Sequence, residues 1–546
     1  DEIVLFSAAR RTERGKMMKL RIRNASIVDG TGAPAFSGDV VVEGGRLASV
    51  GGCVQGDFDR VIDAQGLTVC PGFIDTHSHS DLAILDDPRV LPKIMQGITT
   101  EIFGQDGISM APLPEAYIDD WRENIAGLDG TSDAINWRYY TTAGYFEELA
   151  KRGTGTNVAY LAPHGNIRME AMGLEDRPAA PQEMEKMKDI LRRELEAGAI
   201  GLSTGLIYTP CAYAGTEELI ELCKVVAEYG GSLVVHQRSE SGHILDSMRE
   251  IIRVGRESGV HIHFSHFKIC GKENWKYMEP ALRLLDEAEA EGIQVSLDQY
   301  PYTAGSTMLG VILPPWAHDG GTEKLLERLT DKNCRERLKA DMLANGCDWD
   351  NFVEFAGLKG IYITDVADEQ HRTAVGRNLV QLGELYGEDP LDATFDLLEE
   401  EHNAVGMIDY YGCEENVISV LQRPEQNVCT DGLLGGRPHP RVYGAFPRIL
   451  ARYVREKKCL TLEEAVHKMT GKPAQTFGFT DRGTLQPGKA ADLVLFDPAT
   501  IRDTATFANP IQFPEGIRMV LVNGQIVVDQ NQHTGAIAGQ LLKAKR

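Results

Sequence analysis

The sequence of 546 residues contains no apolar run long enough to cross a membrane, because none approaches the ~18 residues that a transmembrane helix requires. It also contains no C-x-x-C pair, since its ten cysteines are scattered along the chain. Scattered cysteines are typical of reduced thiols rather than of a disulfide framework or a zinc ribbon, so we expect a cytoplasmic protein. Residues 1–18 lack the apolar core of a signal peptide and are interpreted as an N-terminal extension.

Positive charge is scarce as well. The chain has 56 Lys and Arg residues against 80 Asp and Glu, which gives a formal net charge of −24. Nucleic acids and anionic membranes both require a basic face on their partner, so we expect neither. A small-molecule substrate is expected instead, and an anionic one would have to be held by particular Lys or Arg side chains. The sequence leaves the oligomeric state open, with a homo-oligomer as one alternative.

Eight short apolar runs with strand-like composition alternate with segments of helical periodicity. The helical segments include 182–198 and 217–231. Alternation of strand and helix predicts an α/β protein with a parallel sheet, and eight such units predict a (β/α)8 TIM barrel. The eight runs are 68–79, 99–107, 157–164, 199–206, 232–240, 261–268, 294–300 and 427–432.

The two ends of the chain differ from this middle part. Residues 19–70 and 480–546 are rich in short β-strand patterns joined by glycine turns, which predicts one small β-sandwich domain assembled from both ends. Residues 71–479 are then the barrel. The segment from about 303 to 425, between the seventh and eighth strands, is too long for a loop and has helical patterns of its own. We expect it to form an insertion over the C-terminal mouth of the barrel.

Histidine and aspartate residues follow several of the apolar runs at the same end of the expected strand. The stretch PGFIDTHSHSD (71–81) places His77 and His79 on one strand face. A single H-x-H pattern is more often a pair of exposed or hydrogen-bonded histidines, so a metal site depends on partners from other strands. Catalytic groups of a barrel gather at the C-terminal ends of its strands. Imidazole and carboxylate suit Zn²⁺ or a similar divalent ion, and the expected ligands are His77, His79, Asp106, His236, His266 and Asp431.

The order of these residues resembles that of the amidohydrolase superfamily. The tail GTLQPGKAADLVLFD is similar to that superfamily's signature for a β-domain to which the chain returns. Within the superfamily, the chain resembles the N-acyl-D-amino-acid deacylases (D-aminoacylases) over roughly residues 19–535. The motifs that carry this resemblance are STGLIYTP (203–210), SHFK (265–268), DQYPYTAGST (298–307) and TDG (430–432).

The chain departs from its expected relatives in two places. Hydantoinase-like members carry a modified lysine on the fourth strand that bridges two metals, whereas AIGLSTGL (199–206) has no lysine. D-aminoacylases carry a cysteine in a G-N-C-G motif, and this chain has GQDG with Asp106 in its place. A carboxylate is a harder ligand than a thiolate, so metal preference or occupancy is expected to shift. Whether one or two zinc ions bind stays open, as does a plain turn role for Asp106.

The resemblance implies roles for further residues. Asp431 is expected to be the general base, which takes a proton from a metal-activated water and returns it to the leaving amine. Lys268, Tyr300 and Ser306 are expected to hold the α-carboxylate of an N-acyl-amino acid. Three more residues are candidates for substrate binding by their positions in the sequence. Arg441 and Arg437 follow Asp431 in a loop rich in glycine and proline and could meet a carboxylate, an acidic side chain included, with a plain structural role as the alternative. Tyr208 is a candidate for the carbonyl oxygen or the acyl group.

The expected reaction is hydrolysis of the amide of an N-acyl-D-amino acid to a carboxylate and a free D-amino acid. The preference for the D form comes from the resemblance alone. A cyclic amide or imide hydrolase, like hydantoinase or dihydroorotase, is an alternative that the missing lysine disfavours. A barrel that has lost catalysis and serves as an assembly protein is a second alternative, which the retained ligand residues disfavour.

Overall fold

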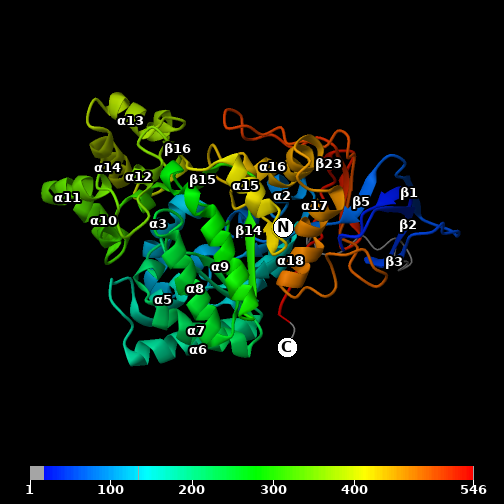
Figure 1. Ribbon diagram of the computed structural model, residues 1–546, viewed down its shortest axis with the longest axis horizontal. Helices are drawn as coiled ribbons and strands as arrows, with labels where there is room; N and C mark the ends of the chain where they lie inside the picture. The colour runs from blue at the N-terminus through cyan, green and yellow to red at the C-terminus, as the bar shows by residue number, and fades with distance from the viewer. Residues whose placement is uncertain (1–17, 133, 545–546) are drawn as a thin grey trace, which may run out of the picture.

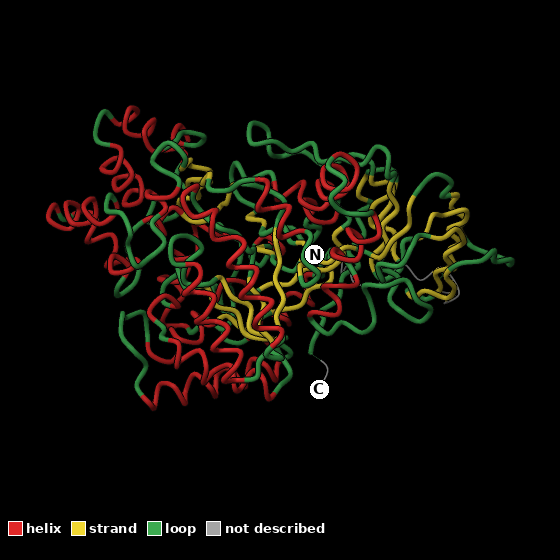
Figure 2. The backbone as a smooth tube through the Cα atoms, in the orientation of Figure 1, coloured by secondary structure: helices red, strands yellow, loops and turns green. Residues whose placement is uncertain are grey.

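The computed structural model describes residues 18–132 and 134–544. Most of the expected N-terminal extension, residues 1–17, therefore lies outside the described part. Within the described residues, no helix is both long enough and apolar enough to span a bilayer. Strands lie at the centre of the molecule with helices around them, and a separate group of strands lies at one end (Figure 2).

Strands from both ends of the chain form one nine-stranded sheet. Its order is β23-β22-β21-β20-β5-β1-β2-β3, and β4 also pairs with β1. Alternation in KLRIRNASI buries Leu20 and Ile22, while Arg21 is half-buried and Arg23 is exposed. The strands are β1 (Lys19–Ile27), β2 (Phe36–Glu43), β3 (Arg46–Val50), β4 (Arg60–Asp63), β5 (Thr68–Pro71), β20 (Leu493–Phe496), β21 (Ile517–Val522), β22 (Gln525–Asp529) and β23 (Gln532–His533).

The central strands are parallel and follow one another in chain order. One sheet has the order β6-β8-β9, and a second has the order β10-β11-β12-β13-β14-β18. In addition, β7 pairs with β19, and this pairing joins the first and last strands of the series. The strands are β6 (Phe73–Asp75), β7 (Ser78–His79), β8 (Ile98–Phe103), β9 (Asn157–Tyr160), β10 (Ala162–Pro163), β11 (Gly201–Gly205), β12 (Ser232–His236), β13 (His261–Phe264), β14 (Val295–Gln299), β18 (Gln426–Val428) and β19 (Gly432–Leu433).

Helices between these strands cover them on the outside (Figure 1). Leu191, Leu222, Ile251 and Leu285, one from each of four successive helices, share a buried core with the strands. The predicted mixed α/β class is confirmed, because apolar stripes at helical spacing pack against apolar strands. The helices are α4 (Thr142–Arg152), α5 (His164–Met172), α6 (Pro181–Ala197), α7 (Thr216–Glu228), α8 (Ile244–Ser258) and α9 (Met278–Ala290).

The segment between β14 and β18 has a sheet and a core of its own. Its three strands are antiparallel in the order β15-β17-β16, and its helices lie at the end of the molecule opposite the terminal sheet (Figure 1). Leu325, Leu382 and Met407 belong to its buried core. The elements are β15 (Ala304–Met308), α10 (Thr322–Thr330), α11 (Lys332–Met342), α12 (Phe352–Phe355), β16 (Ile361–Val366), α13 (Leu379–Tyr386), α14 (Pro390–Glu400) and β17 (Val405–Tyr410).

The remaining α-helices join these parts. Two of them matter for the site: α2 (Leu91–Ile94), and α16 (Arg441–Arg448), which is continued by a π-helical segment, Ile449–Glu456. The others are α1 (Ala83–Asp86), α3 (Ile118–Asp129), α15 (Glu414–Leu421), α17 (Leu462–Met469) and α18 (Gly471–Thr476).

Candidate functional site

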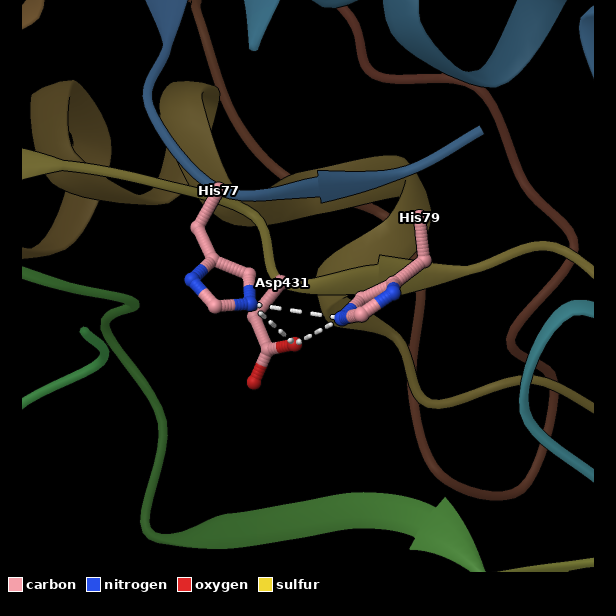
Figure 3. A group of neighbouring side chains, drawn as sticks. All are labelled: His77, His79 and Asp431. Carbon is pink, nitrogen blue, oxygen red and sulfur yellow. Dashed lines mark hydrogen bonds and ion pairs between the residues drawn. The ribbon is translucent and has the colours of Figure 1, made fainter. Parts of the chain in front are cut away.

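His77, His79 and Asp431 converge where β7 meets β19 (Figure 3). The two Nε2 atoms of the histidines are 3.3 Å apart. Asp431 Oδ1 lies 3.6 Å from Nε2 of His77 and 3.4 Å from Nε2 of His79. The Asp431 amide donates to the His77 carbonyl at 2.8 Å, so pairing of the first and last parallel strands fixes this group.

Asp106 lies between this group and His266. Its Oδ2 is 3.4 Å from Nε2 of both His77 and His79, and its Oδ1 is 3.6 Å from Nε2 of His266. Asp106 has a φ of 55°, a left-handed conformation that costs free energy in a residue other than glycine. The end of β11 packs closely against it, because a Cβ atom on Gly205 would lie 2.4 Å from the Asp106 carbonyl oxygen.

His236 and His266 form the opposite side of the site, together with Glu240. His236 Nδ1 is 2.9 Å from His266 Nε2. Glu240 Oε1 is 3.2 Å from His266 Nδ1, and Glu240 Oε2 is 3.6 Å from His236 Nε2. Glu240 was not expected in the site from the sequence, where its only distinguishing feature is its position four residues after His236. All of these side chains are buried.

The carboxylates give this cluster a negative electrostatic potential. Burial and the nearby Lys268 lower the pKa of His266, yet Glu240 and Asp106 outweigh both and raise it to about 9. Burial likewise lowers the pKa of His79, but three neighbouring aspartates raise it well above its usual range. A positive charge is therefore favoured at the centre of the cluster.

Lys268, Tyr300 and Arg441 lie on one side of the centre. Lys268 Nζ is 2.6 Å from Glu240 Oε2. Arg441 is fully buried at the start of α16, with Nη1 at 2.9 Å from Asp431 Oδ2 and its guanidinium 4.5 Å from the centroid of the Tyr300 ring. The cation–π contact and the ion pair hold Arg441 against Asp431.

Of the three other residues expected to bind the substrate, two line the pocket and one does not. Ser306 lines the same pocket, but its hydroxyl donates to the Met407 carbonyl at 2.8 Å. Tyr208 lines the pocket and its hydroxyl is 2.8 Å from Thr307 Oγ1. Arg437 does not reach the pocket: it is exposed and donates to the backbone carbonyls of residues 507 and 508. Its loop runs toward the C-terminal segment, so the expected substrate role for Arg437 has no geometric support.

These side chains enclose a pocket with a cavity volume of about 30 Å³, which is room for about one water molecule. The insertion supplies part of its wall, through Asp350, Phe352, Phe355 and Asp409. Burial raises the pKa of the Asp409 carboxyl to about 7, against the opposing effect of Lys268. The insertion therefore supplies part of the wall of the candidate site.

A buried lysine beneath the site was missed by the sequence analysis. Lys93 Nζ lies 2.7 Å from Asp75 Oδ2, 2.8 Å from Ser78 Oγ and 2.6 Å from Thr430 Oγ1. It is 3.5 Å from Glu101 Oε2. Lys93 thus ties together β6, β7, β8 and the residue before Asp431. Nothing in the pattern of α2 distinguished it from an exposed lysine.

Comparison with known proteins decides the family. A model of the amidohydrolase family matches residues 60–355 and 364–528, most of the chain. The chain belongs to the amidohydrolase family. The membership implied by the motifs of the sequence is confirmed.

Three amidohydrolases illustrate the similarity. The chain is 35% identical to a D-aminoacylase of Alcaligenes xylosoxydans xylosoxydans, over 96% of this chain and 97% of the relative. It is 36% identical to an N-acyl-D-aspartate deacylase of the same organism, over 95% of this chain and 94% of the relative. It is also similar in structure to an N-acyl-D-glutamate deacylase from Bordetella bronchiseptica complexed with zinc and a phosphonate inhibitor. That match has a TM-score of 0.83 and 34% identity, covering 97% of this chain and 100% of the other.

Proposed function

We propose that this amidohydrolase is a zinc-dependent enzyme that hydrolyses N-acyl-D-amino acids to a carboxylate and a free D-amino acid. The observation that carries the proposal is the convergence of buried imidazoles and carboxylates from five strand ends beside two cations, the partly buried Lys268 and the fully buried Arg441. The names of two relatives aligned over nearly the whole chain, a D-aminoacylase and an N-acyl-D-aspartate deacylase, support it.

The donor set fits a divalent metal. Three overlapping groups of residues offer ligand atoms, and within each group these atoms lie within 4.8 Å of one another. Buried Asp106 Oδ1 and His236 Nε2 have no hydrogen-bond partner among the described residues, which supports a ligand at the centre. When bound, such an ion lowers the pKa of water from ~15.7 to about 7 and polarises an amide carbonyl. The residues that would hold one or two ions are His77, His79, Asp106, His236, His266 and Asp431, with Glu240 as a further carboxylate.

Asp431 is suited to move the proton. Burial raises the pKa of its carboxyl, but Arg441 and the neighbouring histidines outweigh burial and hold that pKa below its usual range. It is therefore a carboxylate at neutral pH and takes a proton from water, then donates it to the nitrogen of the leaving amine. Arg441 fixes the orientation of Asp431 through the 2.9 Å ion pair.

Lys268, Tyr300 and Arg441 are suited to hold the α-carboxylate. Arg441 Nε is buried without a hydrogen-bond partner among the described residues, so an anion would satisfy it. Lys268 and Arg441 are the only Lys or Arg side chains in the described wall of this pocket. Since Asp350 and Asp409 also line it, we propose that the amino-acid side chain is neutral rather than acidic.

The strand pairings support the finer architecture. Because β9 leads into β10, β18 into β19, and β6 into β7, the parallel pairings can be followed around a closed ring of eight strands. We therefore propose a (β/α)8 barrel in residues 71–479, with residues 19–70 and 480–546 as a β-sandwich domain. Leu20, Val40, Leu493 and Leu521 share one core in that domain. The ten free cysteines support a cytoplasmic location.

The proposal is tested by assaying N-acetyl derivatives of D- and L-leucine and of D- and L-glutamate, with zinc content measured on the same sample. We expect hydrolysis of N-acetyl-D-leucine in preference to the D-glutamate derivative, and no hydrolysis of either L form. A chelator should abolish activity and added zinc should restore it, because the proposed chemistry needs the ion. Hydrolysis of L substrates alone, or activity indifferent to removal of zinc, would refute the proposal.

Asp106→Ala is expected to weaken zinc binding at least about 10-fold, because it removes the carboxylate that contacts both histidine groups. Elemental analysis and competition with a chromophoric chelator measure the effect. The matched control is Asp106→Cys, which supplies a thiolate ligand at the same position and should keep zinc bound. If Asp106→Ala binds zinc with unchanged stoichiometry and affinity, Asp106 only shapes the turn.

A further inference from the structure

A second cavity lies beside the candidate catalytic pocket, between the turn after β11 and the insertion. Its volume is about 460 Å³. Small-molecule sites usually measure ~300–1,000 Å³, so this cavity has the size of a ligand site. The catalytic pocket itself, with a cavity volume of about 30 Å³, is much the smaller of the two.

The wall of the second cavity is largely apolar. Its apolar side chains include Leu206, Ile207, Val311, Leu313, Trp316 and Trp349. Three of the four charged side chains of the wall have polar partners, and the fourth, Asp348, is exposed. Arg238 pairs with Glu250 at 3.0 Å, Asp350 accepts from Ser239 Oγ at 2.7 Å, and Asp341 accepts from Trp316 Nε1 at 2.9 Å. The cavity therefore suits an apolar group rather than a charged one.

The two cavities share part of their walls. Ile207 and Asp350 line both of them. The next residue, Tyr208, lines the catalytic pocket, and its ring centroid is 5.4 Å from that of His236. The larger cavity thus begins next to the residues proposed to surround the scissile carbonyl.

The order of the strands indicates how the substrate would be oriented in the site. The α-carboxylate would be held by Lys268 after β13, Tyr300 after β14 and Arg441 on α16. In the order β11-β12-β13-β14, the turn after β11 is separated from those anchors by the strand that ends in His236. With the amide carbonyl at the central histidines and the amino-acid part on the side of β13 and β14, the acyl group extends toward β11.

We propose that the 460 Å³ cavity receives the acyl chain of the substrate, and that the enzyme prefers medium-length apolar acyl groups to acetyl. This inference rests on the proposed deacylase function. It adds a binding subsite built by the turn after β11 and by the insertion, outside the groups that hold the metal and the α-carboxylate.

The first test is a series of D-leucine substrates with acetyl, butanoyl, hexanoyl and octanoyl groups. Burial of each methylene should raise kcat/KM by roughly threefold, until the cavity is filled. Ala344→Trp places a large ring into the cavity wall from an exposed position and should remove this gain while leaving hydrolysis of the acetyl substrate unchanged. Asn345→Trp is the matched control, because residue 345 is exposed in the same turn but does not line the cavity.

The second test measures binding without catalysis. Octanoate, a product of the proposed reaction, should change the intrinsic fluorescence of Trp316 and Trp349, which both line the cavity. Trp349→Phe should lose part of that signal, and Ala344→Trp should weaken octanoate binding at least about tenfold, as expected when several methylenes lose their site.

The outcomes separate the two proposals. If N-acetyl-D-leucine is hydrolysed but kcat/KM stays flat or falls with chain length, the acyl subsite is wrong and the deacylase function stands. If Ala344→Trp lowers turnover of acetyl and octanoyl substrates equally, the subsite is also wrong. If no N-acyl-D-amino acid is hydrolysed at all, both proposals fail.

Discussion

Asp431→Asn is expected to lower kcat on N-acetyl-D-leucine by about 10²–10⁴-fold, because the amide can no longer take a proton from water or return it to the amine. The KM should change less than kcat, since Lys268 and Tyr300 are untouched and only Arg441 loses its ion pair with residue 431. Asparagine has nearly the same shape as aspartate, so the fold should persist. Steady-state kinetics, zinc analysis and thermal melting of the same preparation measure these three properties.

Asp129→Asn is the matched control for this experiment. Asp129 is a second buried aspartate, and its Oδ1 lies 3.6 Å from Nδ1 of His79, the ring nitrogen that faces away from the cluster. Its loss should act only through the orientation of His79 and should cost about 10–100-fold in zinc affinity or activity. Activity of Asp431→Asn within tenfold of the unmodified enzyme would show that another group is the base.

Lys93→Met is expected to destabilise the protein by about 3–5 kcal/mol, because it leaves the buried carboxylates of Asp75 and Glu101 without their cation. Activity should fall as well, since Lys93 also holds Ser78 and Thr430, which flank the residues proposed to bind metal. Denaturant-induced unfolding followed by fluorescence, together with zinc content, measures both effects.

Two further variants test whether the loss of stability in Lys93→Met comes from its buried charge or would follow the loss of any lysine. Lys224→Met removes an exposed lysine that pairs with Glu221, and it should change stability by less than about 1 kcal/mol. The double variant Lys93→Met, Asp75→Asn removes a charge of each sign and should recover part of the lost stability. If Lys93→Met unfolds at the same denaturant concentration as Lys224→Met, the buried network does not support the site.

The metal candidates could be recognised because each follows an apolar run. Parallel strands bring their C-terminal ends to one edge, so residues far apart in sequence, such as His77, His236 and Asp431, can be assigned to one place without coordinates. His236 ends β12 as the pattern predicts, whereas His77 lies in the short bend between β6 and β7. The presence of Asp106 where a cysteine was expected could be recognised for the same reason, because this residue lies in the turn after the second strand of the predicted series, β8.

Residues outside strands could not be assigned in this way. Arg437 and Arg441 lie four apart in one loop rich in glycine and proline, so the same role was expected for both. In the structure Arg441 begins α16 and is buried against Tyr300, whereas Arg437 is exposed. The path of a loop depends on contacts with distant segments, which no local pattern encodes.

The sequence by itself determined the α/β class, the order of the strands and the set of histidines and aspartates that gather at one edge, because these follow from hydrophobic periodicity and chain order. Only the tertiary structure decided which charges are buried together. Lys93 and Glu240 read as ordinary surface residues, and burial between elements far apart in the chain gives each its partners. The cost of burying a charge is set by its three-dimensional surroundings, and those exist only after the chain has folded.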